Sequence, residues 1–176
     1  MSTRLLAGLG LGALLMASTS AFAGEQYVDQ TGLAVSGFDV VAYYGLEQAA
    51  VGEDQPLAVA GDPSITAEYN GAVWAFSTEE NRDLFVADPA RYAPAYDGHC
   101  AYGVARDGKV PANPHLWRIV DGVLYLNITT QVVDFWEEDI PGNITLAQSN
   151  WDGLEADPAS GNGIPQFDYS TAPSLE

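Results

Sequence analysis

Soft metal ligands and positive charges are both scarce in this chain. Its 176 residues hold one cysteine, two histidines, and six lysines and arginines against 24 aspartates and glutamates, which gives a formal net charge of −18. A lone cysteine excludes an internal disulfide, so the fold has to rest on packing. The negative charge repels phosphate groups, which argues against nucleic acid and anionic membrane surfaces as partners.

Common catalytic motifs are missing as well. The sequence has no Gly-x-Ser-x-Gly elbow, no phosphate-binding glycine loop and no His-Glu-x-x-His pair. These motifs place a nucleophile, a phosphate or a zinc ion in the enzymes and nucleotide-binding proteins that carry them. Their absence leaves binding better supported than catalysis.

The first 23 residues have the pattern of a secretory signal peptide. Arg4 precedes an apolar run from Leu5 to Ala17, and the Ala-x-Ala sequence ending at Ala23 matches a signal-peptidase site. The run is too short to span a bilayer. We therefore predict cleavage after Ala23 and a periplasmic or secreted protein, with no membrane attachment after cleavage. It begins at Gly24 and keeps five basic and 24 acidic residues, a net charge of −19.

Residues 24–154 show the mixed pattern of a small single α+β domain. Two dipeptides, Asn70-Gly71 and Asp121-Gly122, stand between segments of alternating β-forming residues. Such dipeptides supply the positive φ angles of a tight hairpin turn. They predict two β-hairpins, at about 65–76 and 117–127, packed with short helices.

A helix is expected directly after the first hairpin. Ser77 and Glu80 match a capping box, in which each side chain bonds the other residue's backbone N–H. This pattern predicts a helix from about 78 to 87 that buries Leu84 and Phe85.

The C-terminal part of the chain has weaker signals. Thr129 or Thr130 is expected to cap a helix that reaches about Glu138, and Pro141-Gly142 to separate it from a last helix at about 144–151. Beyond Leu154 the chain is rich in Asp, Pro, Gly and Ser and has few apolar residues, which predicts a disordered acidic tail over 155–176.

Several segments in this order resemble the secreted, stand-alone branch of the YHS domain family. The resemblance spans about residues 27–154. The segments that carry it are Ser36-Gly-Phe-Asp-Val-Val-Ala-Tyr43, Glu68-Tyr-Asn-Gly-Ala-Val-Trp-Ala-Phe-Ser77, Asn81-Arg-Asp-Leu-Phe85, Asp88-Pro-Ala-Arg-Tyr92, Gly98-His-Cys-Ala-Tyr-Gly103 and Asp121-Gly-Val-Leu-Tyr-Leu-Asn127.

The resemblance implies a small α+β module of a kind found beside copper-transporting ATPases and in some multicomponent hydroxylases. Metal-binding members have cysteines just after the hairpin strand and in the helix that follows. Here those places are occupied by Phe76-Ser77 and Asn81, so that metal site does not carry over.

The candidate metal ligands of this chain are therefore His99 and Cys100, with His115, Asp97 or a tyrosine as a third. A thiolate and an imidazole suit copper or zinc, and copper(I) accepts the lower coordination number. Adjacent residues of a strand point to opposite faces, so both can reach one ion only from an irregular loop. On this hypothesis the chain is an exported module that binds copper or another soft metal.

Two alternatives remain open from the residues alone. In the first, Cys100 is a small buried structural residue, and the chain is a metal-free domain that binds a small ligand or a protein. In the second, which has less support, Cys100 is a catalytic nucleophile with His115 as its base. The aromatic residues either line a ligand pocket or form the core; they are Tyr43, Trp74, Phe85, Tyr92, Trp117, Tyr125 and Trp136. The sequence does not give the oligomeric state.

Overall fold

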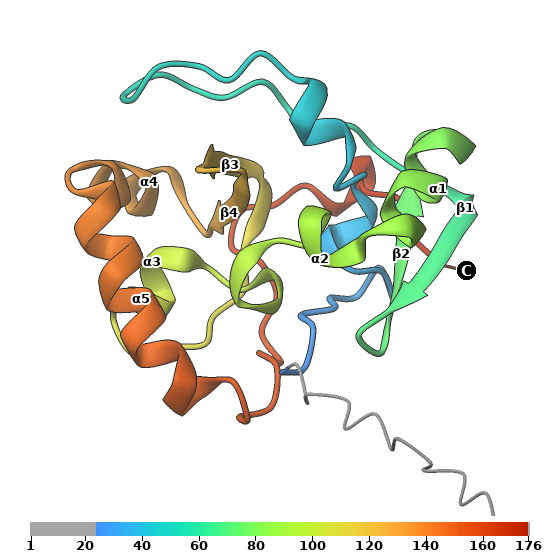
Figure 1. The fold of residues 1–176 in the computed structure, drawn as a ribbon. Coiled ribbons are helices and arrows are strands. Elements are labelled where there is room, and N and C mark those ends of the chain that lie inside the picture. Colours follow the sequence, from blue (N-terminus) through green and yellow to red (C-terminus); the bar gives the residue numbers. More distant parts are fainter. Residues whose placement is uncertain (1–23, 176) are drawn as a thin grey trace, which may run out of the picture.

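Two separate β-hairpins and a set of short helices form a small α+β domain, which confirms the predicted fold class. The computed structural model describes residues 24–175, and the predicted signal peptide lies outside them. The first hairpin and the helix directly after it lie at one side of the molecule, and the second hairpin and the helices that follow it lie at the other (Figure 1). No helix among residues 24–175 is both long and apolar enough to cross a bilayer.

The elements follow one another in a simple order along the chain. The strands are β1 (Asp62–Tyr69), β2 (Ala72–Phe76), β3 (Asn113–Val120) and β4 (Val123–Asn127). The α-helices are α1 (Glu79–Ala87), α2 (Pro89–Tyr92), α3 (Ala101–Ala105), α4 (Thr130–Glu137) and α5 (Ile140–Leu154). Short 3-10 helices lie at η1 (Val35–Gly37), η2 (Ala42–Gly45), η3 (Ala95–Gly98) and η4 (Tyr169–Thr171).

Both hairpins form at the predicted dipeptides. Asn70 and Gly71 have φ angles of 49° and 72°, and Asp121 and Gly122 have φ angles of 51° and 81°. Each hairpin pairs antiparallel, and each has an irregularity in its longer strand, in β3 between Asn113 and Trp117. The second hairpin therefore begins earlier than predicted, and its first strand includes His115.

The helix after the first hairpin is confirmed, but its cap differs from the predicted one. The Thr78 hydroxyl, rather than that of Ser77, accepts a hydrogen bond from the Asn81 N–H. Phe85 is fully buried, whereas Leu84 is 49% exposed, so the expected burial of Leu84 is wrong. The helix has a single buried position because it contacts the domain along one narrow stripe.

The last helix is longer than the sequence predicts. Thr129 caps α4 as expected. Pro141 and Gly142, which were expected to separate two helices, instead lie in the first turn of α5, where the Asp139 side chain accepts from the Gly142 N–H. A proline is compatible with the first helical turn because its missing N–H has no partner there.

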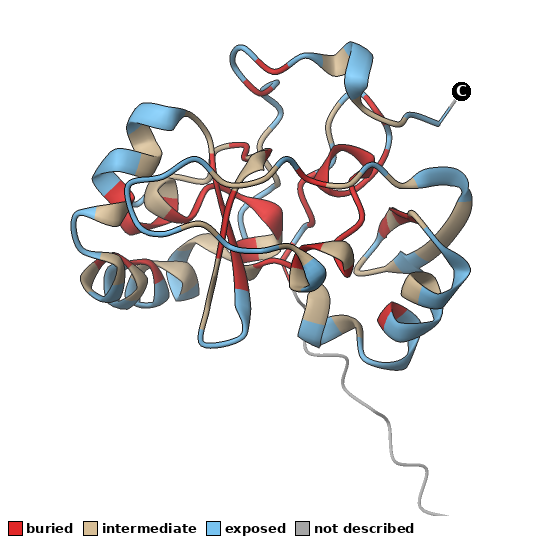
Figure 2. Ribbon diagram, turned by 90° about the horizontal axis from the view of Figure 1, so that it is seen from above, coloured by how far each residue is buried: buried red, intermediate tan, exposed pale blue. Residues whose placement is uncertain are grey.

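The core lies at the centre of the molecule, between the two hairpins (Figure 2). Its largest fully buried side chains include Trp74, Tyr43, Phe76 and Phe85, while Trp136 lies in a second, smaller cluster with Tyr96 and Tyr125. Burying each aromatic side chain removes roughly 150–250 Å² of surface from water. Most of the aromatic residues that the sequence left open as pocket-lining or core residues are therefore buried in the hydrophobic interior.

The C-terminal segment is packed against this core, so the predicted disorder over 155–176 is wrong for the described residues up to 175. Ile164 and Phe167 are 4% and 9% exposed and belong to the main hydrophobic cluster. The Tyr27 hydroxyl donates to the Asn162 carbonyl at 2.9 Å. Tyr169 and Ala172 pack against the same cluster, so the segment has apolar anchors that its overall composition does not suggest.

Candidate functional site

Cys100 is a fully buried helix cap. It precedes α3, and its Sγ accepts a hydrogen bond from the Gly103 N–H at 3.3 Å. The Sγ also lies 3.5 Å from Asn127 Oδ1, which accepts from the Tyr102 N–H at 3.1 Å. Burial raises the pKa of the Cys100 thiol to about 11. The sulfur is thus a protonated thiol at neutral pH, whereas nucleophiles and metal ligands are thiolates.

His99 is also fully buried, and both of its ring nitrogens have partners. Nδ1 lies 2.9 Å from the Tyr96 carbonyl oxygen, to which it must donate, because a carbonyl only accepts. Nε2 then accepts from the Ser160 N–H at 3.1 Å. Burial lowers the pKa of His99 to about 4, so the ring is neutral at pH 7.

His115 lies elsewhere, on β3, and does not join the other two residues. Its Nδ1 accepts from the Ala58 N–H at 3.2 Å, and its ring packs against Phe38 and Phe167. Burial lowers its pKa. Within residues 24–175, no three side chains of His, Cys, Asp or Glu gather closely enough to hold a metal ion.

The place where the family resemblance locates metal ligands holds a hydrogen-bond cluster centred on Asp39. This carboxylate is fully buried. Its Oδ2 accepts from the Ser77 N–H and hydroxyl at 2.8 and 2.6 Å and from Asn81 Nδ2 at 2.7 Å. Its Oδ1 accepts from the N–H groups of Val41 and Ala42 at 2.9 and 3.2 Å. Five donors converge on one carboxylate, so the cluster joins three segments of the chain.

Sequence reasoning overlooked Asp39 because an acid inside an apolar segment gives no sign of its partners. The only available signal was its position three residues before the short helix that begins at Ala42, where a side-chain oxygen commonly accepts from backbone N–H groups. Ser77 and Asn81 are 38 and 42 residues away, and only the folded chain brings them together.

A second overlooked residue, Arg118, fixes a long loop that we call the arm, residues 46–60. Arg118 is 6% exposed, and its Nε donates to Glu137 of α4 at 2.9 Å. Its other two nitrogens donate to the carbonyls of Ala49 and Ala50 at 3.2 and 3.1 Å. The arm runs out over β3 and is held there by this buried ion pair (Figure 1).

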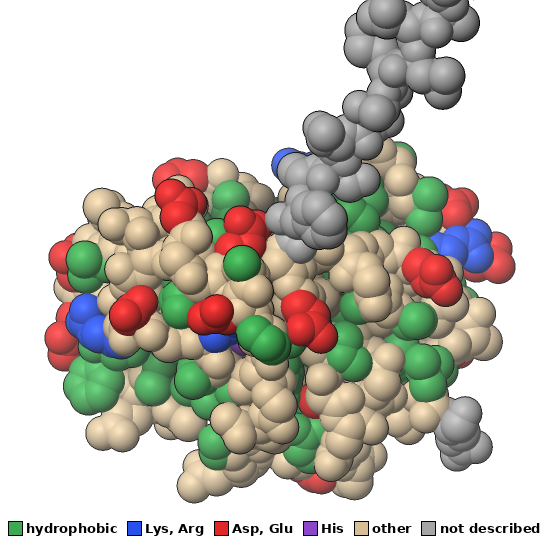
Figure 3. Space-filling model, turned by 90° about the horizontal axis from the view of Figure 1, so that it is seen from below, with side chains coloured by type: hydrophobic (Ala, Val, Ile, Leu, Met, Phe, Trp, Pro, Cys, Tyr) green, Lys and Arg blue, Asp and Glu red, His purple; other side chains and the backbone are tan. Residues whose placement is uncertain are grey.

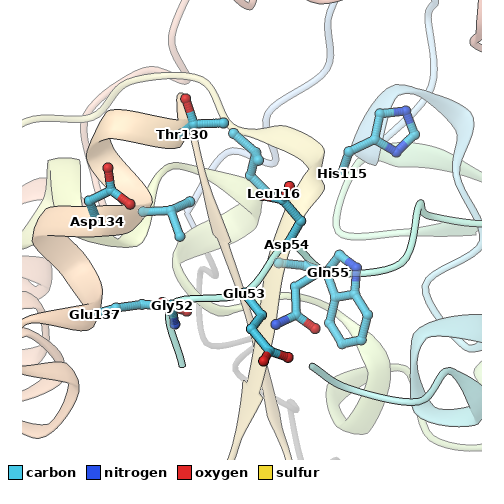
Figure 4. Close-up of a pocket in the computed structure, with 11 residues that line it drawn as sticks. Gly52, Glu53, Asp54, Gln55, His115, Leu116, Thr130, Asp134 and Glu137 are labelled. Carbon is cyan, nitrogen blue, oxygen red and sulfur yellow. Dashed lines mark hydrogen bonds between the residues drawn. The ribbon is translucent and has the colours of Figure 1, made fainter. Parts of the chain in front are cut away.

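A hollow of about 60 Å³ lies between the arm, β3 and α4 (Figure 4). Its lining includes Glu53 and Asp54 from the arm and Asp134 from α4, together with Trp117 and Val133, and it contains no lysine or arginine. His115 lies at its edge, with the ring turned away from the carboxylates (Figure 4). The space is enough for a few water molecules or for one ammonium or guanidinium group.

The surface around the domain is dominated by acids. On the face shown in Figure 3, aspartate and glutamate side chains are scattered widely and lysines and arginines are few. Among residues 24–175 the structure has two ion pairs, Arg82–Asp83 and Arg118–Glu137. Most carboxylates are thus free of a basic partner, and the potential over the surface favours cations.

Comparison with known proteins does not add to these contacts. No family model, curated protein or solved structure matches the chain.

Proposed function

We propose that this chain is an exported binding domain that works without a bound metal and in which Cys100 is structural. One observation carries the proposal: each candidate soft ligand already has an internal hydrogen-bond partner. The Gly103 N–H donates to the Cys100 sulfur, the Ser160 N–H to His99 Nε2, and the Ala58 N–H to His115 Nδ1.

Metal binding at His99 and Cys100 would carry several costs. The Cys100 thiol would have to lose its proton although its pKa is about 11, and the His99 nitrogen would have to give up the Ser160 N–H. Each buried N–H left without an acceptor costs about 1–3 kcal/mol. The same reasoning disfavours a cysteine nucleophile, because its base, His115, is engaged elsewhere.

We further propose that the binding surface is the hollow beneath the arm. Its carboxylates, its size and its lack of basic lining residues suit the ammonium or guanidinium end of a larger ligand or of a partner's side chain. Glu137 is already held by Arg118 and by the Gly52 N–H, which leaves Glu53, Asp54 and Asp134 as the groups that would contact the cation.

Export is the remaining part of the proposal. It rests on the apolar run before Ala23 and on the signal-peptidase sequence that ends there. The mature chain would begin at Gly24, and the periplasm of a bacterium is the compartment that such a signal indicates. Sequencing the N-terminus of the exported protein tests this directly, and an N-terminus other than Gly24 would contradict it.

The binding proposal is tested with a cation and its neutral isostere. Amide resonances of residues 24–176 are followed by NMR while ethylguanidinium or ethylurea is added. Ethylguanidinium should shift the amides of Gly52, Glu53 and Asp134, and ethylurea should not. Asp134→Asn should weaken the response several-fold, whereas Glu138→Gln, which removes a charge from the end of the same helix outside the hollow, should preserve it.

Copper(I) titration addresses the metal-binding alternative. The native domain and its Cys100→Ser variant should take up equal amounts of copper, or none. Uptake of one copper(I) per chain that disappears in the variant would refute the metal-free proposal. Equal NMR shifts with ethylguanidinium in Asp134→Asn and in the native domain would refute the location of the cation site.

A further inference from the structure

Asp97 carries a buried carboxylate oxygen with no partner. Within residues 24–175, three buried polar side-chain atoms lack a hydrogen bond: Tyr96 Oη, Trp136 Nε1 and Asp97 Oδ2. Only Asp97 Oδ2 belongs to an acid. Its other oxygen accepts from Asn70 Nδ2 at 3.3 Å. An unpaired carboxylate in such a place is expensive unless a cation meets it.

The available lysine does not fill this role. Lys109 Nζ donates to the backbone carbonyls of Glu155 and Asp157 at 3.2 and 2.7 Å and lies over the Trp151 ring. Neither of the two ion pairs found in residues 24–175 includes Asp97. Burial raises the pKa of Asp97 even though Lys109 opposes the shift.

Gly24 lies directly against this oxygen. A Cβ placed on Gly24 would collide with Asp97 Oδ2 and would lie 2.5 Å from the Glu155 carbonyl oxygen. Covalent geometry puts a backbone nitrogen about 2.5 Å from such a Cβ. The Gly24 nitrogen is therefore within about 5 Å of both oxygens, and only glycine fits at this position.

The chain segment that contains Gly24 is also held in place by hydrogen bonds. Asn70 Nδ2 donates to the Gly24 carbonyl at 2.9 Å, and the Tyr27 N–H donates to the Asp97 carbonyl at 2.9 Å. Gly24 also borders a hollow whose other lining residues include Glu25, Asp152, Glu155 and Asp157. A positive charge on the Gly24 nitrogen would lie among these acids and close to Asp97 Oδ2, a buried carboxylate oxygen without a hydrogen-bond partner.

We propose that the Gly24 α-ammonium, created when the signal peptide is removed, is the missing partner of Asp97. This inference rests on the proposed cleavage after Ala23. Before cleavage the nitrogen is a neutral amide with one N–H. After cleavage it carries a full charge and three donors, and a small rotation within Gly24 brings it to Asp97 Oδ2 and the Glu155 carbonyl. Processing thereby adds a buried ion pair and stabilises the mature domain over its precursor.

A double-mutant comparison tests the pair on protein whose N-terminus is set by design. One form begins at Gly24, and the other begins at Ser20 and so retains four residues before it. Asp97→Asn is introduced into each. Asparagine tolerates the φ angle of 51° at this position and can keep the Asn70 contact, so the substitution removes mainly the charge.

Asp97→Asn is expected to change the melting temperature differently in the two forms. In the form that begins at Gly24, Asp97→Asn should lower the melting temperature by about 5 °C. In the form that begins at Ser20, it should leave the melting temperature unchanged or raise it, because the carboxylate there has no cation to lose. An equal decrease in both forms would refute the ion pair.

This result is independent of the export proposal. Sequencing of the exported protein tests where cleavage occurs, while the comparison above tests what the Gly24 ammonium does once it exists. If cleavage occurs elsewhere and the two designed forms still differ as expected, only the processing role fails.

Discussion

Replacing Asp39 with asparagine is expected to destabilise the domain by about 3–5 kcal/mol. The carboxylate is fully buried and accepts five hydrogen bonds, which join the segment before η2 to the end of β2 and to α1. Asparagine has nearly the same shape, so the substitution leaves no cavity and isolates the loss of the acceptor.

The magnitude follows from which donors lose their acceptor. Whichever way the new amide turns, its NH₂ group faces donors. On one side these are the N–H groups of Val41 and Ala42, and on the other they are Ser77 and Asn81. At least two buried donors are left unpaired at about 1–3 kcal/mol each, and the NH₂ group itself is unpaired too. Domains of this size have a free energy of unfolding of about 5–15 kcal/mol, so the loss is a large share of it.

Urea denaturation of residues 24–176, followed by circular dichroism at pH 7, measures this loss. Ser77→Ala removes one donor and keeps the carboxylate, so it should cost less, about 1 kcal/mol. Asp83→Asn is the matched control, since Asp83 is an exposed acid on α1, and it should leave the midpoint unchanged. A loss below about 1 kcal/mol for Asp39→Asn would refute the structural role of the cluster.

The remaining predictions concern His99, Cys100 and the C-terminal segment. Because the pKa of His99 is about 4 in the fold and 6.5 for a free side chain, the unfolded chain binds the extra proton between these values. The neutral His99 ring therefore contributes about 3 kcal/mol to the free energy of unfolding above pH 6.5, and this contribution is lost as the pH falls to 4. Urea midpoints that fall equally with pH in the native domain and in His99→Gln would contradict this. The pKa of Cys100 is about 11 against 9.0, so the unfolded thiol ionises first and stability should fall by about 3 kcal/mol between pH 9 and 11. At pH 8 the thiol should react with Ellman's reagent only on unfolding, and fast labelling of the folded domain would disprove its burial. Truncation after Pro158 removes Ile164 and Phe167 from the core and should cost at least about 4 kcal/mol, and an unchanged urea midpoint would show that the segment does not stabilise the fold.

Local sequence signals predicted the parts of the fold that local physics determines. Asn70-Gly71 and Asp121-Gly122 formed their turns because positive φ angles are a property of those residues and need no distant contact. Thr129 also capped its helix without a distant contact, since its hydroxyl accepts from the Val132 N–H three residues further on. The expected cap at Ser77 was wrong, since its hydroxyl instead donates to Asp39, 38 residues away.

The C-terminal segment shows the limit of composition. Residues 155–175 have few apolar side chains, but Ile164 and Phe167 enter the core and the Ser160 N–H reaches His99. Average hydrophobicity counts side chains, whereas burial depends on whether the remaining structure offers them a place. A sequence without coordinates does not reveal such a place.

The sequence by itself determined the α+β class, both hairpin turns, the acidic surface and the short supply of soft ligands, because each follows from residue type or from spacing over a few residues. Only the tertiary structure decided what those ligands do. It turned His99 and Cys100 inward, where each bonds a different backbone group, placed His115 away from both on strand β3, and left Asp97 beside Gly24. The physical reason is that hydrogen-bond partners and burial are set by segments that meet in space although they lie far apart in the chain, as His99 and Ser160 do at a separation of 61 residues.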